Sequence, residues 1–186
     1  MWWLLASCSS DPGASAPVPR RVDAVAAHQQ VDPPDAFCDV WSEGGAASVF
    51  PAPAVDGDPI APATGWRWVN VWATWCAPCI AEMPKLVRWR DELSAQGAPV
   101  ELVLVSVDEQ APVMDRFLKQ HPDFPPSTRL ADPATLPDWL TALGLGTSAA
   151  IPLHLFVDAE NRLRCVRAGE LDEHHLPSIR AILSGS

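Results

Sequence analysis

The sequence predicts an α/β domain in which a central mixed β-sheet is flanked by helices. Runs rich in β-branched and aromatic residues, which favour strands, alternate with stretches whose apolar residues recur at helical spacing. Near the end of the chain, two strand-like runs follow each other across a short turn. The alternation predicts parallel strands with helical connections, and the terminal hairpin makes the sheet mixed. The length of 186 residues, 48% of them apolar, is enough for one domain with a sizeable core.

The first 36 residues are expected to lie outside this domain. Residues 4–8, LLASC, resemble the site at which a lipoprotein signal is cut before a cysteine that becomes lipidated, here Cys8. A complete signal has a basic region and an apolar run of about 7 to 15 residues, so residues 1–8 are either a truncated remnant or a chance match. Residues 9–36 are rich in Pro, Ala and Ser and predict a flexible linker, which leaves residues 37–186 for the domain.

The first half of the domain is expected to place a helix directly after a buried strand. Residues 48–57 contain prolines and predict an edge strand or an extended arm. Residues 66–74, WRWVNVWAT, have the composition of a buried strand. A helix is expected over 77–96, ended by Gly97 and kinked by Pro84 after its first turns.

The second half continues the alternation. Residues 100–108, VELVLVSVD, form a nearly continuous apolar run, which is typical of a central parallel strand covered on both faces. The remaining elements are expected in the order helix, strand, helix, hairpin and helix, over residues 111–120, 127–133, 136–145, 151–169 and 172–183.

The overall charge excludes some classes of partner. A formal net charge of −10 argues against nucleic acid, whose phosphates require Lys and Arg, and against binding to an anionic membrane by charge alone. No stretch reaches the roughly 18 to 20 apolar residues that span a bilayer. We therefore expect no nucleic-acid partner, and membrane contact only through an N-terminal lipid anchor.

The chain contains five cysteines, at positions 8, 38, 76, 79 and 165. If Cys8 carries a lipid and Cys76 pairs with Cys79, then Cys38 and Cys165 remain. An even remainder in an exported protein suggests a structural disulfide. The alternative is that these two cysteines are unrelated small apolar residues.

The close pair, Cys76 and Cys79, fits a redox site at the start of a helix. The partial positive charge and free N–H groups there stabilise a thiolate, so Cys76 is predicted to be the exposed attacking thiolate and Cys79 the inner resolving one. Pro78 suits the first turn because its missing N–H would have no partner. No metal is expected, because a lone Cys-x-x-Cys supplies two ligands where structural zinc requires four. A purely structural disulfide would close too short a loop to stabilise much.

Residues 69–84, VNVWATWCAPCIAEMP, resemble the active-site strand and helix of the thioredoxin superfamily, and more narrowly of the TlpA/ResA-like thiol-disulfide oxidoreductases. The resemblance covers about residues 48–183. It implies a thioredoxin-like fold with an inserted helix-strand unit, which residues 109–146 are long enough to supply. It also implies that Pro152 is a cis proline that packs against the cysteines. The alternative is an ordinary proline that begins a strand.

The resemblance also assigns roles to individual residues. Glu82 matches a glutamate that is characteristic of the TlpA/ResA group and that tunes the cysteines or relays protons to them; the alternative is a solvated helix carboxylate. Asn70 stands where thioredoxin has a buried aspartate, which shifts the proton-accepting role toward Glu82. The residues implied to contact substrate are Trp75, Ala77, Pro78, Ile151 and Pro152.

Other polar and aromatic residues carry weaker signals. Trp72 is as consistent with the core as with the site, and Asp108 is either functional or a turn residue at the end of its strand. His154 lies two residues beyond the proline on the same strand face and could approach the site, although a buried structural histidine explains it better. His174 and His175 are expected to be exposed.

The function implied by the resemblance is that of an extracytoplasmic thiol-disulfide oxidoreductase, lipid-anchored in the periplasm or cell envelope and needing no cofactor. Its substrates would be disulfides of extracytoplasmic proteins, with apocytochrome c the best-known target of the family, and a membrane thiol-disulfide protein would donate electrons. Ala77-Pro78 replaces the histidine of strong oxidants, which favours a reductase. The alternatives are a thiol peroxidase, for which Thr74 is thin support, a disulfide isomerase, or a non-enzymatic copper chaperone, which usually has one more residue between its cysteines.

Overall fold

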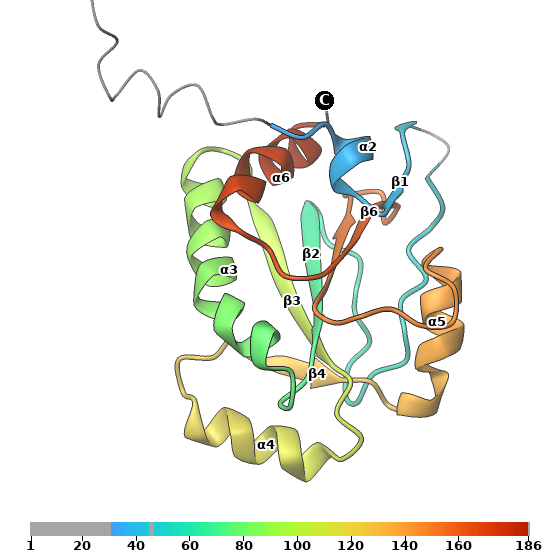
Figure 1. Ribbon diagram of the computed structural model, residues 1–186, viewed down its shortest axis with the longest axis vertical. Helices are drawn as coiled ribbons and strands as arrows, with labels where there is room; N and C mark the ends of the chain where they lie inside the picture. The colour runs from blue at the N-terminus through green and yellow to red at the C-terminus, as the bar shows by residue number, and fades with distance from the viewer. Residues whose placement is uncertain (1–30, 45–46, 186) are drawn as a thin grey trace, which may run out of the picture. The chain divides into compact units, whose positions relative to one another are not determined.

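A single six-stranded sheet organises the protein, whose computed structural model describes residues 31–44 and 47–185 (Figure 1). The strand order is β1-β6-β5-β2-β3-β4. The β2–β3 and β3–β4 pairs are parallel, whereas β1–β6, β5–β6 and β2–β5 are antiparallel, so the sheet is mixed as predicted. The strands are β1 Val40–Trp41, β2 Trp66–Trp72, β3 Val100–Ser106, β4 Ser127–Arg129, β5 Leu153–Val157 and β6 Leu163–Ala168.

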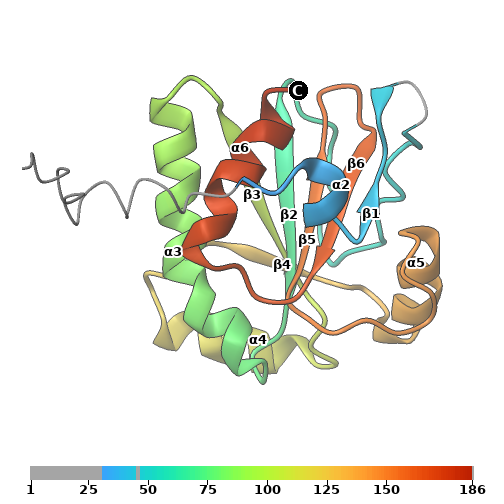
Figure 2. The same ribbon diagram turned by 45° about the horizontal axis from the view of Figure 1, so that its top comes forward.

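Helices connect and cover these strands. They are α2 Pro34–Phe37, α3 Ala77–Ala95, α4 Ala111–Gln120, α5 Leu136–Ala142 and α6 Leu176–Leu183, with short 3-10 turns η2 Pro133–Thr135 and η3 Glu173–His175. Helices α3 and α6 lie side by side on one face of the sheet (Figure 2). Arg180 of α6 reaches Glu92 of α3 across this contact, with 3.3 Å between Nη2 and Oε1. No helix among the described residues is both long and apolar enough to cross a membrane.

The central strand β2 is buried because both of its faces are covered. Every residue from Arg67 to Trp72 is buried, and Trp68 stacks against Trp89 of α3 with 6.5 Å between ring centroids. Trp72, on the same face as Trp68, donates its indole hydrogen to Ser127 Oγ at 2.9 Å, and on the opposite face Arg67 donates to the Ala61 carbonyl at 3.0 Å. Burial on both faces explains why this strand is apolar and aromatic almost throughout instead of alternating.

Helix α3 positions the cysteine pair. It begins immediately after Cys76, continues through Pro84 and is followed by Gly97, whose φ of +83° suits the residue just after a helix end. The kink that Pro84 predicts does not end the helix, which runs over 19 residues.

Of the two alternatives for residues 48–57, the structure shows the extended arm, since only isolated bridges join Val49 to Arg162 and Val55 to Leu130. The predicted boundary between linker and domain falls inside α2, which packs near α6. The lipidation candidate Cys8 lies outside the described residues.

A disulfide joins the first described elements to the sheet. Cys38 follows α2 directly and is bonded to Cys165 of β6, with 5.5 Å between the Cα atoms and 127 residues between them in sequence. Cys165 is also the register partner of Trp41 in β1. The short strand β1 is therefore held to the edge of the sheet by both backbone pairing and a covalent bond.

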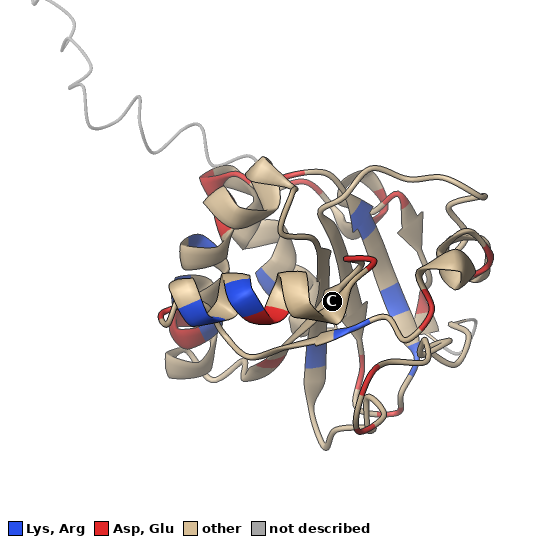
Figure 3. Cartoon of the chain, turned by 90° about the horizontal axis from the view of Figure 1, so that it is seen from below, with Lys and Arg blue, Asp and Glu red and all other residues tan. Residues whose placement is uncertain are grey.

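Charged residues of both signs occur throughout the described part of the chain. In the view of Figure 3, segments with Lys and Arg are interspersed with segments with Asp and Glu. Among the described residues, this view presents no continuous basic stripe of the kind that follows a nucleic-acid backbone.

Candidate active site

The cysteine pair stands where β2 passes into α3. Cys76 and Cys79 form a disulfide with 5.3 Å between their Cα atoms. Cys76 caps the helix, because its Sγ accepts the backbone N–H of Cys79 at 3.3 Å. Cys79 is fully buried and Cys76 is only 5% exposed, so in the disulfide form Cys76 is less exposed than the sequence suggested. The reason is the chain opposite it, whose Ile151 carbonyl oxygen lies 3.8 Å from Cys76 Sγ.

The turn between β2 and Cys76 is fixed by Asp108. This carboxylate accepts the backbone N–H of Thr74 at 3.0 Å, the Thr74 hydroxyl at 2.7 Å and the Ser106 hydroxyl at 2.6 Å. Arg129 donates to the Asp108 carbonyl at 3.1 Å from the other side. Of the two alternatives for Asp108, the structure shows a buried residue that holds the loop before the cysteines.

The peptide bond between Ile151 and Pro152 is cis. Pro152 is buried directly before β5, and its carbonyl accepts the backbone N–H of Gly169 at 2.8 Å. The Ile151 carbonyl is therefore presented toward Cys76 at the start of the strand that pairs with β2.

An open apolar groove of about 1020 Å³ begins at Cys76. Its lining includes Trp75, Ala77, Pro78, Val113 and Ile151, together with the acidic Asp108 and Glu109. Trp75 is 68% exposed, which is unusual for so large an apolar side chain, and Ala77 and Pro78 are exposed beside it. Cys79 does not line this groove, so Cys76 is the cysteine that an incoming molecule meets first.

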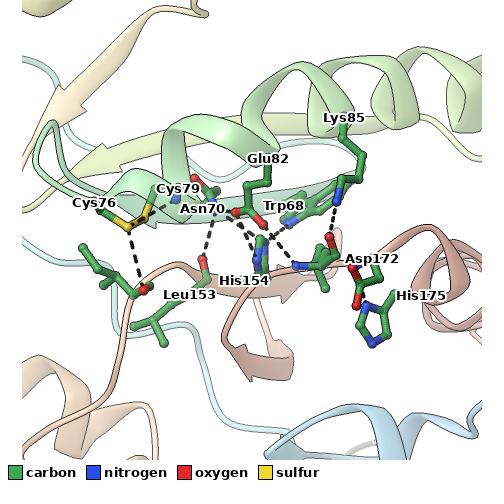
Figure 4. A network of polar contacts seen from close by, with 12 residues as sticks. Trp68, Asn70, Cys76, Cys79, Glu82, Lys85, Leu153, His154, Asp172 and His175 are labelled. Carbon is green, nitrogen blue, oxygen red and sulfur yellow. Dashed lines mark hydrogen bonds and ion pairs between the residues drawn. A yellow bond between two sulfur atoms is a disulfide. The ribbon is translucent and has the colours of Figure 1, made fainter.

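Behind the cysteines lies a buried polar network (Figure 4). Glu82, one helical turn after Cys79, is completely buried instead of solvated. Its Oε2 accepts the backbone N–H of Leu171 at 3.1 Å, and its Oε1 accepts from Asn70 Nδ2 at 3.3 Å. Lys85 of the same helix donates to the Leu171 carbonyl.

The environment of Glu82 shifts the protonation of its carboxyl toward neutral pH. Burial raises its pKa from 4.5 to about 7, against the opposing effects of the Leu171 N–H, the Lys85 charge and the Asn70 amide. A carboxyl with this pKa exchanges a proton readily at neutral pH.

A profile of the family described as Redoxin matches residues 64–183, more than half of the chain. The chain belongs to the Redoxin family. The matched residues contain the cysteine pair, the network behind it and the cis proline, and the thioredoxin-like fold predicted from sequence is confirmed.

Several known proteins are similar to this Redoxin-family chain. A thiol-disulfide oxidoreductase ResA of Oceanobacillus iheyensis is 43% identical over 53 residues, which is 28% of this chain and 27% of that protein. ResA of Bacillus subtilis is 35% identical over 54 residues, 29% of each chain. The chain thus matches less than a third of the length of either relative. A thiol:disulfide interchange protein of the thioredoxin family from Chlorobium tepidum superposes with a TM-score of 0.55 at 26% identity, covering 74% of this chain and 97% of that one.

Sequence reasoning gave too little weight to one residue of the Redoxin site. His154 is buried as expected, but its Nε2 lies 3.4 Å from Glu82 Oε1, inside the network. The available signal was its position two residues beyond Pro152 on the inward face of β5. Trp68, which donates to the same imidazole at 3.2 Å, gave no signal beyond that of a core residue.

One of the two histidines near the last helix differs from the expectation that both are exposed. His174 is exposed, but His175 is buried because Phe37 of α2 packs on it with 5.6 Å between ring centroids. Together with Asp172 these histidines offer ligand atoms within 4.8 Å of one another. However, His175 Nδ1 accepts the Asp172 backbone N–H at 2.8 Å, so its second nitrogen carries the ring hydrogen and neither is a free ligand.

Proposed function

We propose that this Redoxin-family protein is a thiol-disulfide oxidoreductase that reduces disulfides of other proteins outside the cytoplasm. The observation that carries the proposal is the Cys76–Cys79 disulfide at the start of α3, with Cys76 at the end of an apolar groove and Cys79 sealed behind it. The ResA relatives and the thiol:disulfide interchange protein support this chemistry.

The reaction is a pair of exchanges that starts from the reduced protein. The Cys76 thiolate attacks one sulfur of the substrate disulfide, so that a Cys76–substrate bond forms and the second substrate sulfur leaves as a thiolate. The Cys79 thiolate then attacks Cys76, forms the Cys76–Cys79 bond and releases the first substrate sulfur. Two electrons pass to the substrate, whose two thiolates each take up a proton.

The structure gives different help to the two cysteines. A hydrogen bond from the backbone N–H of Cys79, in the first turn of α3, favours the thiolate form of Cys76. Cys79 is fully buried, and burial disfavours a charged thiolate. We propose that Glu82, one turn further along α3, takes the Cys79 proton before the second exchange.

The groove favours a polypeptide over a small thiol as substrate. Its exposed Trp75 and apolar walls suit an extended segment around the substrate disulfide, and the Ile151 backbone lies beside Cys76 to pair with it. The finer expectations are proposals of the same kind: apocytochrome c as one target, and a membrane thiol-disulfide protein as electron donor.

An extracytoplasmic location is supported by the second disulfide. Bonds such as Cys38–Cys165 persist in oxidising compartments and are rare in the reducing cytosol. We place the protein in the periplasm or cell envelope, with residues 37–186 as the redox domain, residues 9–36 as a tether and Cys8 as the lipidated residue.

Trapping tests the proposed function directly. In a Cys79→Ala variant the mixed disulfide cannot resolve, so the protein should accumulate covalent adducts with oxidised proteins from an envelope extract, and reductant should release them. Cys76→Ser is the matched control and should trap nothing. Equal trapping by both variants would contradict the assignment. Consumption of peroxide, or tight copper binding that depends on Cys76, would favour the alternative functions.

A further inference from the structure

The hydrogen bonds around His154 determine which ring nitrogen carries its hydrogen. The indole Nε1 of Trp68 can only donate, and it lies 3.2 Å from His154 Nδ1. Asn70 Nδ2, also a donor, lies 3.4 Å from the same nitrogen. His154 Nδ1 must therefore accept, and in the neutral imidazole the hydrogen is on Nε2.

The hydrogen on Nε2 faces Glu82. The distance from His154 Nε2 to Glu82 Oε1 is 3.4 Å, and both side chains are fully buried. Nε2 meets strict hydrogen-bond geometry with no atom among the described residues, and two acceptors face it: the Gly169 backbone and Glu82 Oε1. A carboxylate is a stronger hydrogen-bond acceptor than a backbone carbonyl, which favours Glu82 as the partner of the Nε2–H.

Among the described residues, the polar groups that contact the Glu82 oxygens are consequently donors. Oε1 meets Asn70 Nδ2 and the His154 Nε2–H, while Oε2 meets the Leu171 N–H. Such a shell stabilises the carboxylate and opposes the burial that favours the neutral acid. Trp68 makes the shorter of the two contacts that keep Nδ1 an acceptor, so without the indole hydrogen only the longer Asn70 contact would hold the ring hydrogen on Nε2.

We propose that Trp68 and His154 are positioning residues that orient a hydrogen bond onto Glu82 and keep its carboxyl able to accept a proton beside the cysteines. The catalytic consequence rests on the proposed function, but the hydrogen bonding does not. Burial lowers the pKa of His154 to about 3, so the ring stays neutral and donates without carrying charge.

Other charges face this pair from each neighbouring element. Lys85 of α3 and Arg167 of β6 lie near the histidine, as does His175 of η3. Glu170, which follows β6, faces Glu82. These charged groups are unchanged in the variants at Trp68, Trp89 and His154 described below. Differences in the Glu82 pKa between those variants therefore do not come from the loss of one of these charges.

Nitrogen NMR of the reduced, isotopically labelled protein tests the tautomer. We expect the two-bond correlation pattern of an Nε2–H imidazole for His154, with an Nε2 resonance that shifts as Glu82 titrates. We expect that shift to vanish in Glu82→Gln. A ring with its hydrogen on Nδ1, or an Nε2 resonance that ignores Glu82, would overturn the proposal.

Substitutions test the consequence for Glu82. In Trp68→Phe the pKa of Glu82, followed by its carboxyl carbon resonance, should rise by about one unit, which is what one lost charge-assisted hydrogen bond is worth. The matched control is Trp89→Phe, a buried tryptophan of the same aromatic cluster that donates to Glu173 instead, at 3.3 Å. An equal shift in both variants would show a general packing effect and overturn the proposal.

Variants of His154 test the same hydrogen bond without changing Trp68, in case Trp68→Phe does not fold. His154→Leu should raise the pKa of Glu82 as Trp68→Phe does, whereas His154→Gln should restore it, because an amide can accept from Trp68 and donate to Glu82. The pH at which reduction of a protein disulfide becomes fast should move upward with the pKa in each variant. If the NMR results hold while no protein disulfide is reduced, the proposed function fails and the hydrogen-bond assignment stands.

Discussion

His154 Nε2 lies 3.4 Å from Glu82 Oε1, and neither side chain has any solvent exposure. Burial moves the two groups in opposite directions: it raises the pKa of Glu82 to about 7 and lowers that of His154 to about 3. Folding near pH 5.5 therefore removes a proton from the histidine and adds one to the glutamate. The Glu82–His154 pair in the folded protein is neutral between about pH 3 and about pH 7 and negative above that range.

The first prediction concerns the pH dependence of stability. Between pH 4.5 and 6.5, both the folded and the unfolded chain hold one proton on this pair, so its contribution to the free energy of unfolding should be flat. From pH 6.5 to about 7 only the folded chain holds the proton of Glu82, so stability falls as pH rises. Below pH 4.5 Glu82 is protonated in both states, whereas His154 is protonated only in the unfolded chain. The unfolded chain then holds one proton more than the folded chain, so stability falls as pH falls.

Two variants separate the contributions of Glu82 and His154 to the pH dependence of stability. In Glu82→Gln only the histidine remains, so stability should rise with pH from 4.5 to 6.5 relative to the parent protein. In His154→Gln it should fall over the same range. Each slope is about 1.4 kcal/mol per pH unit. Urea unfolding of the oxidised proteins at three pH values measures these slopes. Parallel dependence of the unfolding free energy on pH in all three proteins would contradict the opposite pKa shifts of Glu82 and His154.

The second prediction is that the Cys38–Cys165 bond carries a large part of the stability. Opening a loop of 127 residues should lower the free energy of unfolding by about 5 kcal/mol, because the unfolded chain regains the entropy that the bond removes. Urea unfolding of the double variant Cys38→Ala/Cys165→Ala, compared with Cys76→Ala/Cys79→Ala, measures the difference. Hydrogen exchange in the double variant should be faster at Val40 and Trp41. A loss no larger than that of the active-site pair would refute the prediction.

The third prediction separates recognition of substrate from exchange chemistry. Trp75→Ala should raise the KM for a protein disulfide about tenfold, as expected for removal of an interface aromatic worth 1 to 2 kcal/mol, and should leave the reaction with a small aromatic disulfide nearly unchanged. Val49→Ala is the control, because Val49 is 69% exposed but does not line the groove. An equal loss with both substrates would show that Trp75 acts on the cysteines themselves.

The fourth prediction is that Glu82→Gln blocks the second exchange more than the first. Without a proton acceptor beside the buried Cys79, turnover at pH 7 should fall about 100-fold, the usual contribution of a positioned acid or base. The mixed disulfide with Cys76 should accumulate in rapid-quench experiments. Glu92→Gln, on the same helix but paired with Arg180 at the surface, should behave like the parent protein. Slower first exchange without accumulation would assign Glu82 to Cys76 instead.

The fifth prediction concerns the direction of electron flow. Ala77 and Pro78 place no charged or titratable group between the cysteines. The potential of the pair should therefore lie nearer to about −270 mV, as in thioredoxin, than to the value of about −120 mV of a strong oxidant. Equilibration with glutathione buffers measures it. A value at the oxidising end would make the protein an oxidase of thiols.

The fold class and the location of the cysteine pair were predictable from the order of the residues. The strand residues 66–74, the helix after Cys76 and the apolar run at 100–108 were all predictable, because local composition and periodicity decide whether a segment forms a strand or a helix. The brief α2 and β1 were not, since elements of four and two residues have no periodicity to detect.

The surroundings of Glu82 arise from the packing of separate elements of the fold against one another. Asn70 of β2, His154 of β5 and the Leu171 backbone come from distant parts of the chain, and strand pairing and helix packing bring them to one carboxyl. Spacing along the sequence does not tell which ring nitrogen faces a donor, and it left open whether the Glu82 carboxyl is buried or solvated. The protonation of Glu82 is set by those two quantities, so it follows from the packed core alone.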